Sequence, residues 1–297
     1  MRDQDELIFL GFGGARFNVV SQYHPTGGII LRMNGVQVHV DPGPAAIFYA
    51  QLAEVNPEET RVVVATHDHT DHVVDVPVML EAMHGGNMQR RVGTLISTPD
   101  YIANLHSYYR NLLENIIALT PGSKCVIRGQ PEINVVATPA VHDENVATIG
   151  VKFYSGDYCI GFTSDTEVFP AFTSTYADCD ILVCNVLRPE NYHCDRHMTT
   201  NEVLPYLEDL HRHHALKVVV LTHLGARWGS DRIKPVIDAQ LKKIKDRLPC
   251  PVFPAVFGVR ARVADLMQGR EPKYTLYSLK EKLLTYLKNC NYFQDNA

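Results

Sequence analysis

The sequence predicts a single α/β domain built in layers, and three observations support this fold class. Short apolar runs typical of buried strands recur along the chain, and several are apolar at nearly every residue, as expected for strands covered on both faces. Segments with apolar residues at helical spacing lie between these runs. No low-complexity tract, Ser/Gly-rich linker or solenoid repeat interrupts the chain. Strands and helices mixed in this way indicate one layered domain.

Each predicted element has a local signal in the sequence. The strand runs are ELIFLGF (6–12), GGIILRM (27–33), VQVHVD (36–41), RVVVAT (61–66), INVVAT (133–138), VATIGVKFY (146–154), YCIGFTSD (158–165), DILVCNV (180–186) and LKVVVLTH (216–223). The helical segments are 44–55, with Pro44 near the first turn, 71–86, which ends in two glycines, and 99–116, 199–214 and 230–248.

The C-terminal part of the chain is expected to be an addition to this core. We predict a hydrolase domain over residues 1–262 and a helical extension over 263–297 that packs on the same domain. The segment 270–297 has the pattern of a terminal helix, either for packing or for dimer formation, which favours a homodimer.

Composition excludes several classes of protein. The chain has 297 residues, 45% of them hydrophobic, and a formal net charge of −5, so no basic excess indicates a nucleic-acid surface. Seven cysteines without a C-x-x-C pair fit free thiols in a reducing compartment. The sequence has neither a secretory signal pattern nor an apolar run of membrane-spanning length, so we expect a cytoplasmic location without membrane contact.

Polar residues follow directly on several predicted strands. Loops leaving the end of a sheet are where α/β proteins build their sites, because the strands fix the positions and the loops supply the chemistry. The strand-end residues are Asp41, His67, His69, His142, Asp165 and His223.

The run THDHTDH (66–72) is the densest of these signals. His67 and His69 are two apart on an extended strand end and can point the same way, whereas Asp71 and His72 fall on the turn into the next helix. Clustered imidazoles and carboxylates need a compensating charge when buried, and they are ligands for Zn²⁺, Mn²⁺ or Fe²⁺. The run therefore predicts a site for two adjacent divalent metal ions. For an isolated histidine such as His142 or His223, a half-buried structural residue is the alternative.

The pattern resembles the metallo-β-lactamase superfamily. THDHTDH resembles its HxHxDH motif, and VHVDPG, TPAVHD, GFTSDTE and LTHLG follow the superfamily's motif order over about residues 7–260. The resemblance implies a four-layer αββα sandwich with a dinuclear metal site between the sheets. It implies that Asp41 orients a ligand histidine and that Asp71 has a catalytic role as well. The implied ligands are His67, His69 and His142 for one ion, Asp71, His72 and His223 for the other, and Asp165 between the two.

Within the superfamily, three segments resemble ribonuclease Z and related phosphodiesterases. They are the opening FLGFGGARF, the segment DRHMTTNEVLPYLEDL around His197, and LTHLGAR. The resemblance implies that His197 contacts the scissile phosphate and helps to protonate the leaving oxygen. Arg227 is either a second phosphate contact or a surface charge.

Two departures from ribonuclease Z bear on the substrate. Asn185, in VCNVLRP, stands where an acidic partner of the extra histidine is expected, and an amide holds an imidazolium less firmly. The interval between His142 and Asp165 is too short for the long Gly/Pro-rich arm that grips tRNA in many of those enzymes. This argues against tRNA as the substrate.

The sequence therefore predicts a hydrolase that uses a hydroxide held by two metal ions, with a small or flexible phosphodiester as its substrate. Two alternatives remain open: hydrolysis of a lactone or thioester at the same metal site, and a non-catalytic binding or regulatory protein that keeps the scaffold. The segment GFGGARF does not fit G-x-G-x-x-G, and a tight turn of the first hairpin explains it better than a phosphate cradle.

Overall fold

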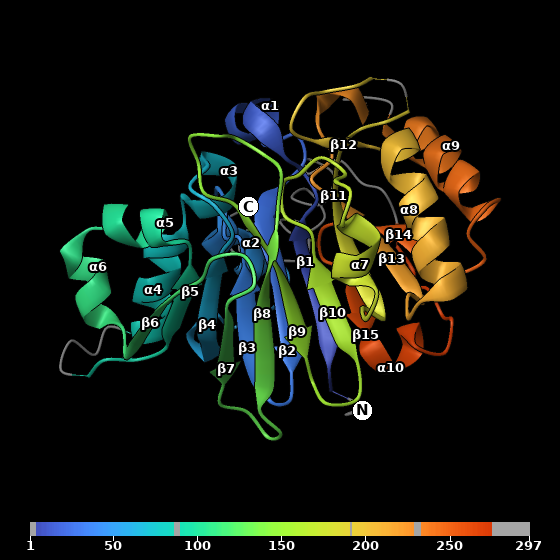
Figure 1. Ribbon diagram of the computed structural model, residues 1–297. Coiled ribbons are helices and arrows are strands. Elements are labelled where there is room, and N and C mark those ends of the chain that lie inside the picture. The colour runs from blue at the N-terminus through green and yellow to red at the C-terminus, as the bar shows by residue number, and fades with distance from the viewer. Residues whose placement is uncertain (1–3, 86–89, 191, 229–232, 275–297) are drawn as a thin grey trace, which may run out of the picture.

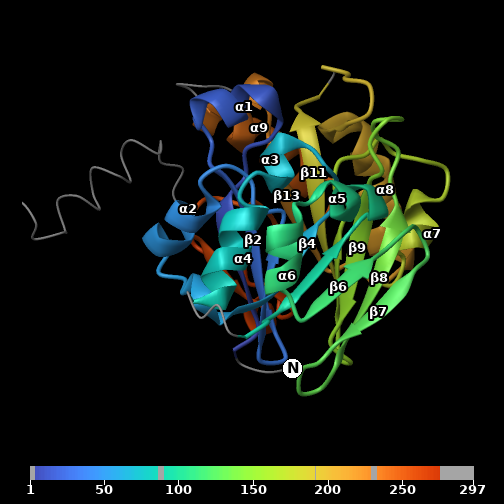
Figure 2. The same cartoon turned by 90° about the vertical axis from the view of Figure 1, so that its left-hand side faces the viewer.

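Two β-sheets packed face to face form the centre of the molecule, and helices cover their outer faces (Figure 1). The computed structural model describes residues 4–85, 90–190, 192–228 and 233–274 of the chain. The view from the side shows the four layers in the order helices, sheet, sheet, helices (Figure 2). The protein thus has the αββα sandwich that the resemblance implied.

The first sheet has seven strands in the order β15-β1-β2-β3-β4-β5-β6. The strands β1, β2 and β3 pair antiparallel, but the strands from β3 to β6 run parallel, so their carboxyl ends share one edge. The strands are β1 (Glu6–Gly11), β2 (Thr26–Met33), β3 (Val36–Val40), β4 (Thr60–Ala65), β5 (Thr94–Ser97), β6 (Asn115–Ala118) and β15 (Arg260–Arg262).

The second sheet follows the order β14-β13-β11-β10-β9-β8-β7, and the short β12 pairs with β11. Strands β10, β11, β13 and β14 are parallel, and β8 has the same direction because β9 is antiparallel to both of its neighbours. The strands are β7 (Lys124–Ile127), β8 (Ile133–Pro139), β9 (Ile149–Tyr154), β10 (Cys159–Phe162), β11 (Ile181–Arg188), β12 (Met198–Thr199), β13 (Val218–Thr222) and β14 (Val252–Pro254).

Helices cover both sheets from the outside (Figure 2). On the first sheet lie α2 (Ala46–Leu52), the 3₁₀ turn η1 (Pro57–Glu59), α4 (Val76–His84), α5 (Pro99–Asn104) and α6 (Ser107–Leu112). On the second lie α7 (Phe172–Tyr176), α8 (Thr200–His213) and α9 (Ile233–Lys245). At the ends of the sandwich lie α1 (Ala15–Ser21), α3 (Thr70–Val73), the turn η2 (Ala226–Trp228) and α10 (Val263–Leu266).

The alternation of side chains along each strand explains the layers. In β4, Val62 and Val64 point into the core between the sheets, whereas Val63 and Ala65 pack under the helices on the outside. All four are fully or nearly fully buried. Burying one such valine side chain contributes about 1.5–3 kcal/mol, so a strand that is apolar at every position is stable only between two covered faces.

All nine predicted strand runs contain strands, but the short strands β5, β6, β7, β12, β14 and β15 were not predicted. Among the helical segments, 99–116 is wrong in part. Leu105 and His106 have extended backbones that separate α5 from α6, and the last residues of the segment pair as β6. Segment 71–86 is likewise divided, because a new helix with a proline in its first turn begins after Asp75.

The structure describes only part of the predicted C-terminal extension. Val263 and Leu266 of α10 are buried in the main core. Most of the predicted terminal helix, residues 275–297, lies outside the described residues, so the division at 262/263 and the homodimer stay predictions. Within the described ranges no helix is long and apolar enough to cross a membrane.

Candidate metal centre

The predicted site residues meet at the edge of the sandwich where the carboxyl ends of the strands of both sheets lie. From the first sheet come Asp41, after β3, and His67, after β4. The second sheet contributes His142 in the loop after β8, Asp165 after β10 and His223 after β13. Residues far apart in the sequence converge because five strands end at the same place.

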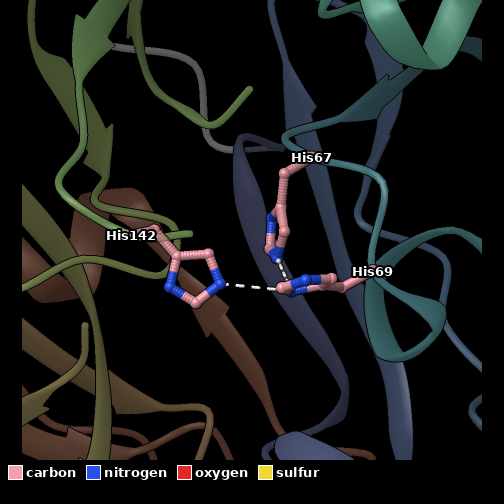
Figure 3. Close-up of side chains that lie close together, drawn as sticks. All are labelled: His67, His69 and His142. Carbon is pink, nitrogen blue, oxygen red and sulfur yellow. Dashed lines mark hydrogen bonds between the residues drawn. The ribbon is translucent and has the colours of Figure 1, made fainter. Parts of the chain in front are cut away.

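His67, His69 and His142 form the first cluster, and their rings face one another from the two sheets (Figure 3). The Nδ1 atom of His69 lies 3.1 Å from Nε2 of His67 and 3.1 Å from Nε2 of His142. Nitrogens bound to one tetrahedral metal ion at about 2.05 Å are separated by about 3.3 Å. The spacing of these three nitrogens therefore fits a shared divalent cation.

The Nδ1 atoms of His67 and His142 have partners outside the cluster, so their Nε2 atoms can face into it. Nδ1 of His142 lies 2.9 Å from the backbone carbonyl oxygen of Arg196, to which it can only donate. Nδ1 of His67 lies 3.1 Å from the hydroxyl of Thr66. With Nδ1 protonated, Nε2 of His142 presents a lone pair to the cluster, as a metal ligand must.

Asp71, His72 and His223 form the second cluster together with Asp165. Nε2 of His223 lies 3.1 Å from Oδ2 of Asp71 and 3.2 Å from Oδ2 of Asp165. Nε2 of His72 is buried without a hydrogen-bond partner and points at the same two carboxylates from 3.6 and 3.5 Å. A buried, unpartnered nitrogen aimed at two carboxylates fits the donor set of a second divalent ion.

Asp165 lies between the two clusters. Its Oδ2 atom is 3.9 Å from Nε2 of both His67 and His142, in addition to its contacts with the second cluster. Its Oδ1 atom accepts a 2.8 Å hydrogen bond from the side-chain amide of Asn185. The side chain of Asn185, which stands where an acidic partner of His197 was expected, thus orients the carboxylate of Asp165.

The carboxylates and histidines at the centre compensate one another's charge. Burial alone would raise the pKa of Asp165, but the histidines around it, led by His223 and His72, outweigh this and hold the pKa well below its usual range. Burial lowers the pKa of His72, yet Asp71, Asp165 and Asp41 raise it well above the ordinary value. The carboxylates thus hold positive charge on His72, which is the charge that a bound metal ion would supply.

A second layer of hydrogen bonds connects the two clusters. The hydroxyl of Thr66 donates to Oδ2 of Asp41 (2.8 Å), and the same oxygen accepts from Nδ1 of His72 (2.8 Å). The hydroxyl of Ser164 donates to that of Thr66 at 2.7 Å. The Thr66 hydroxyl also contacts His67, so it is bonded to one histidine of the first cluster directly and to His72 of the second through Asp41.

The sequence analysis missed the role of the segment GFGGARF. It is not the turn of a hairpin, because α1 lies between β1 and β2. The backbone N–H of Ala15 donates to Oδ2 of Asp71 at 2.7 Å. A Cβ atom on Gly14 would lie 2.3 Å from the ring of His223. The glycine pair is the feature of the sequence that could have indicated this role. Glycine has no side chain, so the backbone can come this close to the second cluster.

His197 lies over the centre, in the loop that leads into β12. Its Nδ1 atom is 3.7 Å from Oδ2 of Asp165, and its ring stacks on that of His223 with centroids 5.7 Å apart. Burial lowers the pKa of His197 to about 4, so the imidazole is neutral at pH 7. The side chain of His197 is 16% exposed, which leaves an edge of the ring open to solvent.

Arg227 is not brought into the clusters. It is exposed in η2, and its guanidinium lies 5.3 Å from the ring centroid of Tyr192, a cation–π contact in the loop before His197. Asp68, the remaining carboxylate of the run THDHTDH, accepts a hydrogen bond from Asn104 and belongs to neither cluster.

Comparison with known proteins agrees with this architecture. The sequence model of the Beta-lactamase superfamily domain matches residues 37–224, more than half of the chain. The chain belongs to the metallo-β-lactamase superfamily. Proteins of this superfamily are hydrolases that bind divalent metals, and the clusters of histidine and aspartate side chains in this chain could hold such ions.

The relatives of this superfamily member include ribonuclease Z. An uncharacterized protein of Methanocaldococcus jannaschii is 28% identical over 91% of this chain and 98% of its own length. A ribonuclease Z of Pyrobaculum islandicum is 25% identical over 79% of this chain and 92% of its own. The crystal structure of the metallo-β-lactamase fold protein YhfI from Bacillus subtilis has the same fold, with a TM-score of 0.69, 17% identity, and coverage of 86% of this chain and 98% of its own.

The substitution Gly14→Ala is expected to disturb the second cluster. The new methyl group would push the ring of His223 away, at a cost of about 1–3 kcal/mol in the free energy of unfolding, and the protein should bind less metal. Metal content by mass spectrometry and urea unfolding measure this. Gly122→Ala is the control: its Cβ meets open space, so only backbone strain of about 1 kcal/mol is expected, with unchanged metal content.

The substitution Thr66→Val keeps the shape of the side chain but removes the hydroxyl that joins the clusters. We expect metal affinity to fall by about 10–100-fold, because the histidines lose their fixed orientation. Thr66→Ser keeps the hydroxyl and should remain close to wild type. Competition titration with a chromophoric chelator measures the affinity, and equal values for the valine and serine variants would contradict the linking role.

Proposed function

We propose that the protein is a phosphodiesterase that uses two divalent metal ions, which can be Zn²⁺, Mn²⁺ or Fe²⁺. The donor set contains only imidazole nitrogens and carboxylate oxygens, which suits these ions. The proposed ligands are His67, His69 and His142 for one ion and Asp71, His72 and His223 for the other, with Asp165 as the shared carboxylate.

When bound, the two ions would lower the pKa of a coordinated water molecule and polarise the phosphate. The carboxylates of Asp165 and Asp71 have further roles. Asp165, oriented by Asn185, offsets part of the cationic charge at the point between the clusters. Asp71 acts as ligand and catalytic residue: its pKa, which burial alone would raise, is held far below the usual range by His72 and His223, so its carboxylate stays ionised and can orient the attacking water.

The observation that carries the proposal is the position of His197. His197 belongs to neither of the two ligand sets proposed above, and its Nδ1 atom lies 3.7 Å from Oδ2 of the shared carboxylate, close to His142 as well. A neutral imidazole there can donate its N–H to a phosphate oxygen. An anionic substrate opposes the lowering of its pKa by burial, so that His197 can take up a proton and deliver it to the leaving oxygen.

The substrate that we propose is a small or flexible phosphodiester. Between His142 and Asp165 the chain forms only a loop and the strands β9 and β10, which leaves no arm for gripping tRNA. The cavity beneath the centre, bordered by Thr66, Ser164 and Asn185, has a volume of about 50 Å³. That is room for a few water molecules, so a diester must approach from the outer side, where His197 lies.

The substitution His197→Ala tests the proposal through the leaving group. With an alkyl leaving group, which needs a proton, we expect kcat/KM to fall by about 10²–10⁴-fold. With bis-p-nitrophenyl phosphate, whose leaving group departs as a stable anion, the loss should be about tenfold or less. Steady-state kinetics on metal-reconstituted protein measure both values.

His213→Ala is the matched control, because His213 is exposed on α8 and bonded to Asp209. It should leave both rates unchanged. Equal losses with both leaving groups would contradict the general-acid role of His197. Turnover of an acyl lactone or a thioester but of no phosphodiester would favour the alternative hydrolase. Protein that binds less than one metal ion per chain and hydrolyses none of these would be a binding protein.

A further inference from the structure

Glu167 belongs to neither cluster of the candidate metal centre, yet its carboxylate contacts the loop that carries His197. Glu167 lies two residues after Asp165 and is half-buried. One of its carboxylate oxygens accepts a hydrogen bond from the backbone N–H of Arg196, 29 residues further along the chain. This bond joins the loop after β10 to the loop that leads into β12.

Arg196 is held at its carbonyl group as well, by a proposed metal ligand. The carbonyl oxygen accepts a hydrogen bond from Nδ1 of His142 at 2.9 Å. Arg196 has a left-handed backbone, with a φ of 68°, which costs about 1 kcal/mol or more for a residue with a side chain. Such a conformation persists where its surroundings fix it, and here Glu167 and His142 bind the two backbone polar groups of this residue.

Glu167 is in turn bonded to the residue before His142. Its backbone N–H donates to the carbonyl oxygen of Val141 at 2.8 Å. The backbone N–H of Val141 donates to the hydroxyl of Thr166 at 2.8 Å, and that hydroxyl donates to the carbonyl oxygen of Glu167 at 2.7 Å. Since Val141 and His142 are neighbours in the chain, the bonds that run through Glu167 and Arg196 form a closed network.

We propose that Glu167 is a positioning residue that sets the orientation of the His142 imidazole and the position of His197. Its carboxylate holds the backbone of Arg196, whose carbonyl group binds Nδ1 of His142, so that Nε2 faces the first cluster. His197 is the next residue in the chain, and its ring centroid lies 4.8 Å from that of His142. The inference rests on the metal-binding role proposed for His142, but not on the identity of the substrate.

The ion pairs of the Arg196 side chain explain this arrangement less well. The guanidinium lies 3.3 Å from a carboxylate oxygen of Asp143 and 3.8 Å from one of Glu144. The side chain of Arg196 is 43% exposed and that of Glu144 is 80% exposed, and exposed pairs of this kind contribute about 0–1 kcal/mol. We therefore attribute the positioning to the backbone bonds of Arg196.

Substitutions of Glu167 separate the reach of its side chain from its charge. Glu167→Gln keeps an oxygen at the same reach and should bind metal like the wild type, whereas Glu167→Asp keeps the charge but is one methylene group shorter. We expect Glu167→Asp and Glu167→Ala to weaken binding at the first cluster about tenfold, because the imidazole of His142 loses its fixed orientation. Titration of Zn²⁺ into the metal-free protein, followed by the NMR signals of the histidine ring nitrogens, measures each cluster separately. Glu144→Ala is the matched control and should leave both affinities unchanged.

The Nδ1 proton of His142 gives a second measurement, which a role of Glu167 in overall stability would not single out. In the zinc-loaded wild type this proton should exchange slowly with solvent, because it is donated to a carbonyl oxygen. In Glu167→Asp it should exchange roughly tenfold faster, while the amides of the core strands keep their wild-type rates.

Equal zinc affinities in the wild type, Glu167→Asp and Glu167→Ala would overturn the proposal. A Glu167→Gln variant as weak as Glu167→Asp would also overturn it, because charge and not reach would then matter. Loss of both ions together with faster exchange of the core amides would show a general structural role and would overturn it too. If Glu167→Ala does not fold, the comparison of Glu167→Asp with Glu167→Gln decides. A wild-type protein that binds no Zn²⁺ at the first cluster would overturn the proposed metal site and this inference with it, whereas failure of the variants alone concerns only Glu167.

Discussion

The arrangement of the centre depends on one buried carboxylate. The side chain of Asp165 is 3% exposed and lies within 4 Å of nitrogens from five histidines. A charge of this kind costs several kcal/mol to bury unless opposite charge surrounds it. Every neighbouring strand end contributes to that compensation: an amide from β11 and imidazoles after β4, β8 and β13. Both clusters therefore help to compensate the buried negative charge of Asp165. Their imidazole and carboxylate donors suit divalent cations, which would add to this compensation.

The sequence predicted the parts of this arrangement that follow from periodicity and from motif order. Strand runs that are apolar throughout predicted the buried sheets, and polar residues directly after them predicted the edge where His67, Asp165 and His223 meet. It could not predict contacts between segments without a local signature. Short strands such as β14 carry too few residues for a periodic signal. The hydrogen bond from the amide of Asn185 to Asp165 had no signal in the sequence, because it depends on how β10 and β11 pair.

Several residues around the centre have strained backbone conformations. Ala15, Asp41, Ser164, Arg196 and His223 all have left-handed backbones, with φ between 51° and 68°, and all lie at or beside the centre. Each costs about 1 kcal/mol or more for a residue with a side chain. Such conformations persist where the surroundings require them, and here they direct the Ala15 amide to Asp71 and the Arg196 carbonyl to His142. Part of the folding free energy is thus used to pre-orient donors and acceptors.

The loop that carries His197 includes Arg196, one of these strained residues, and contacts the first cluster. The carbonyl of Arg196 fixes His142, the backbone amide of Arg196 donates to the carboxylate of Glu167, and the next residue is His197 itself. The position of His197 is therefore tied to a residue of the first cluster through one peptide unit. A change that loosens the first cluster should displace His197 as well, so losses of metal affinity and of proton transfer are expected to be coupled and not additive. The acid function proposed for His197 would in this sense be a property of the assembled centre and not of one histidine.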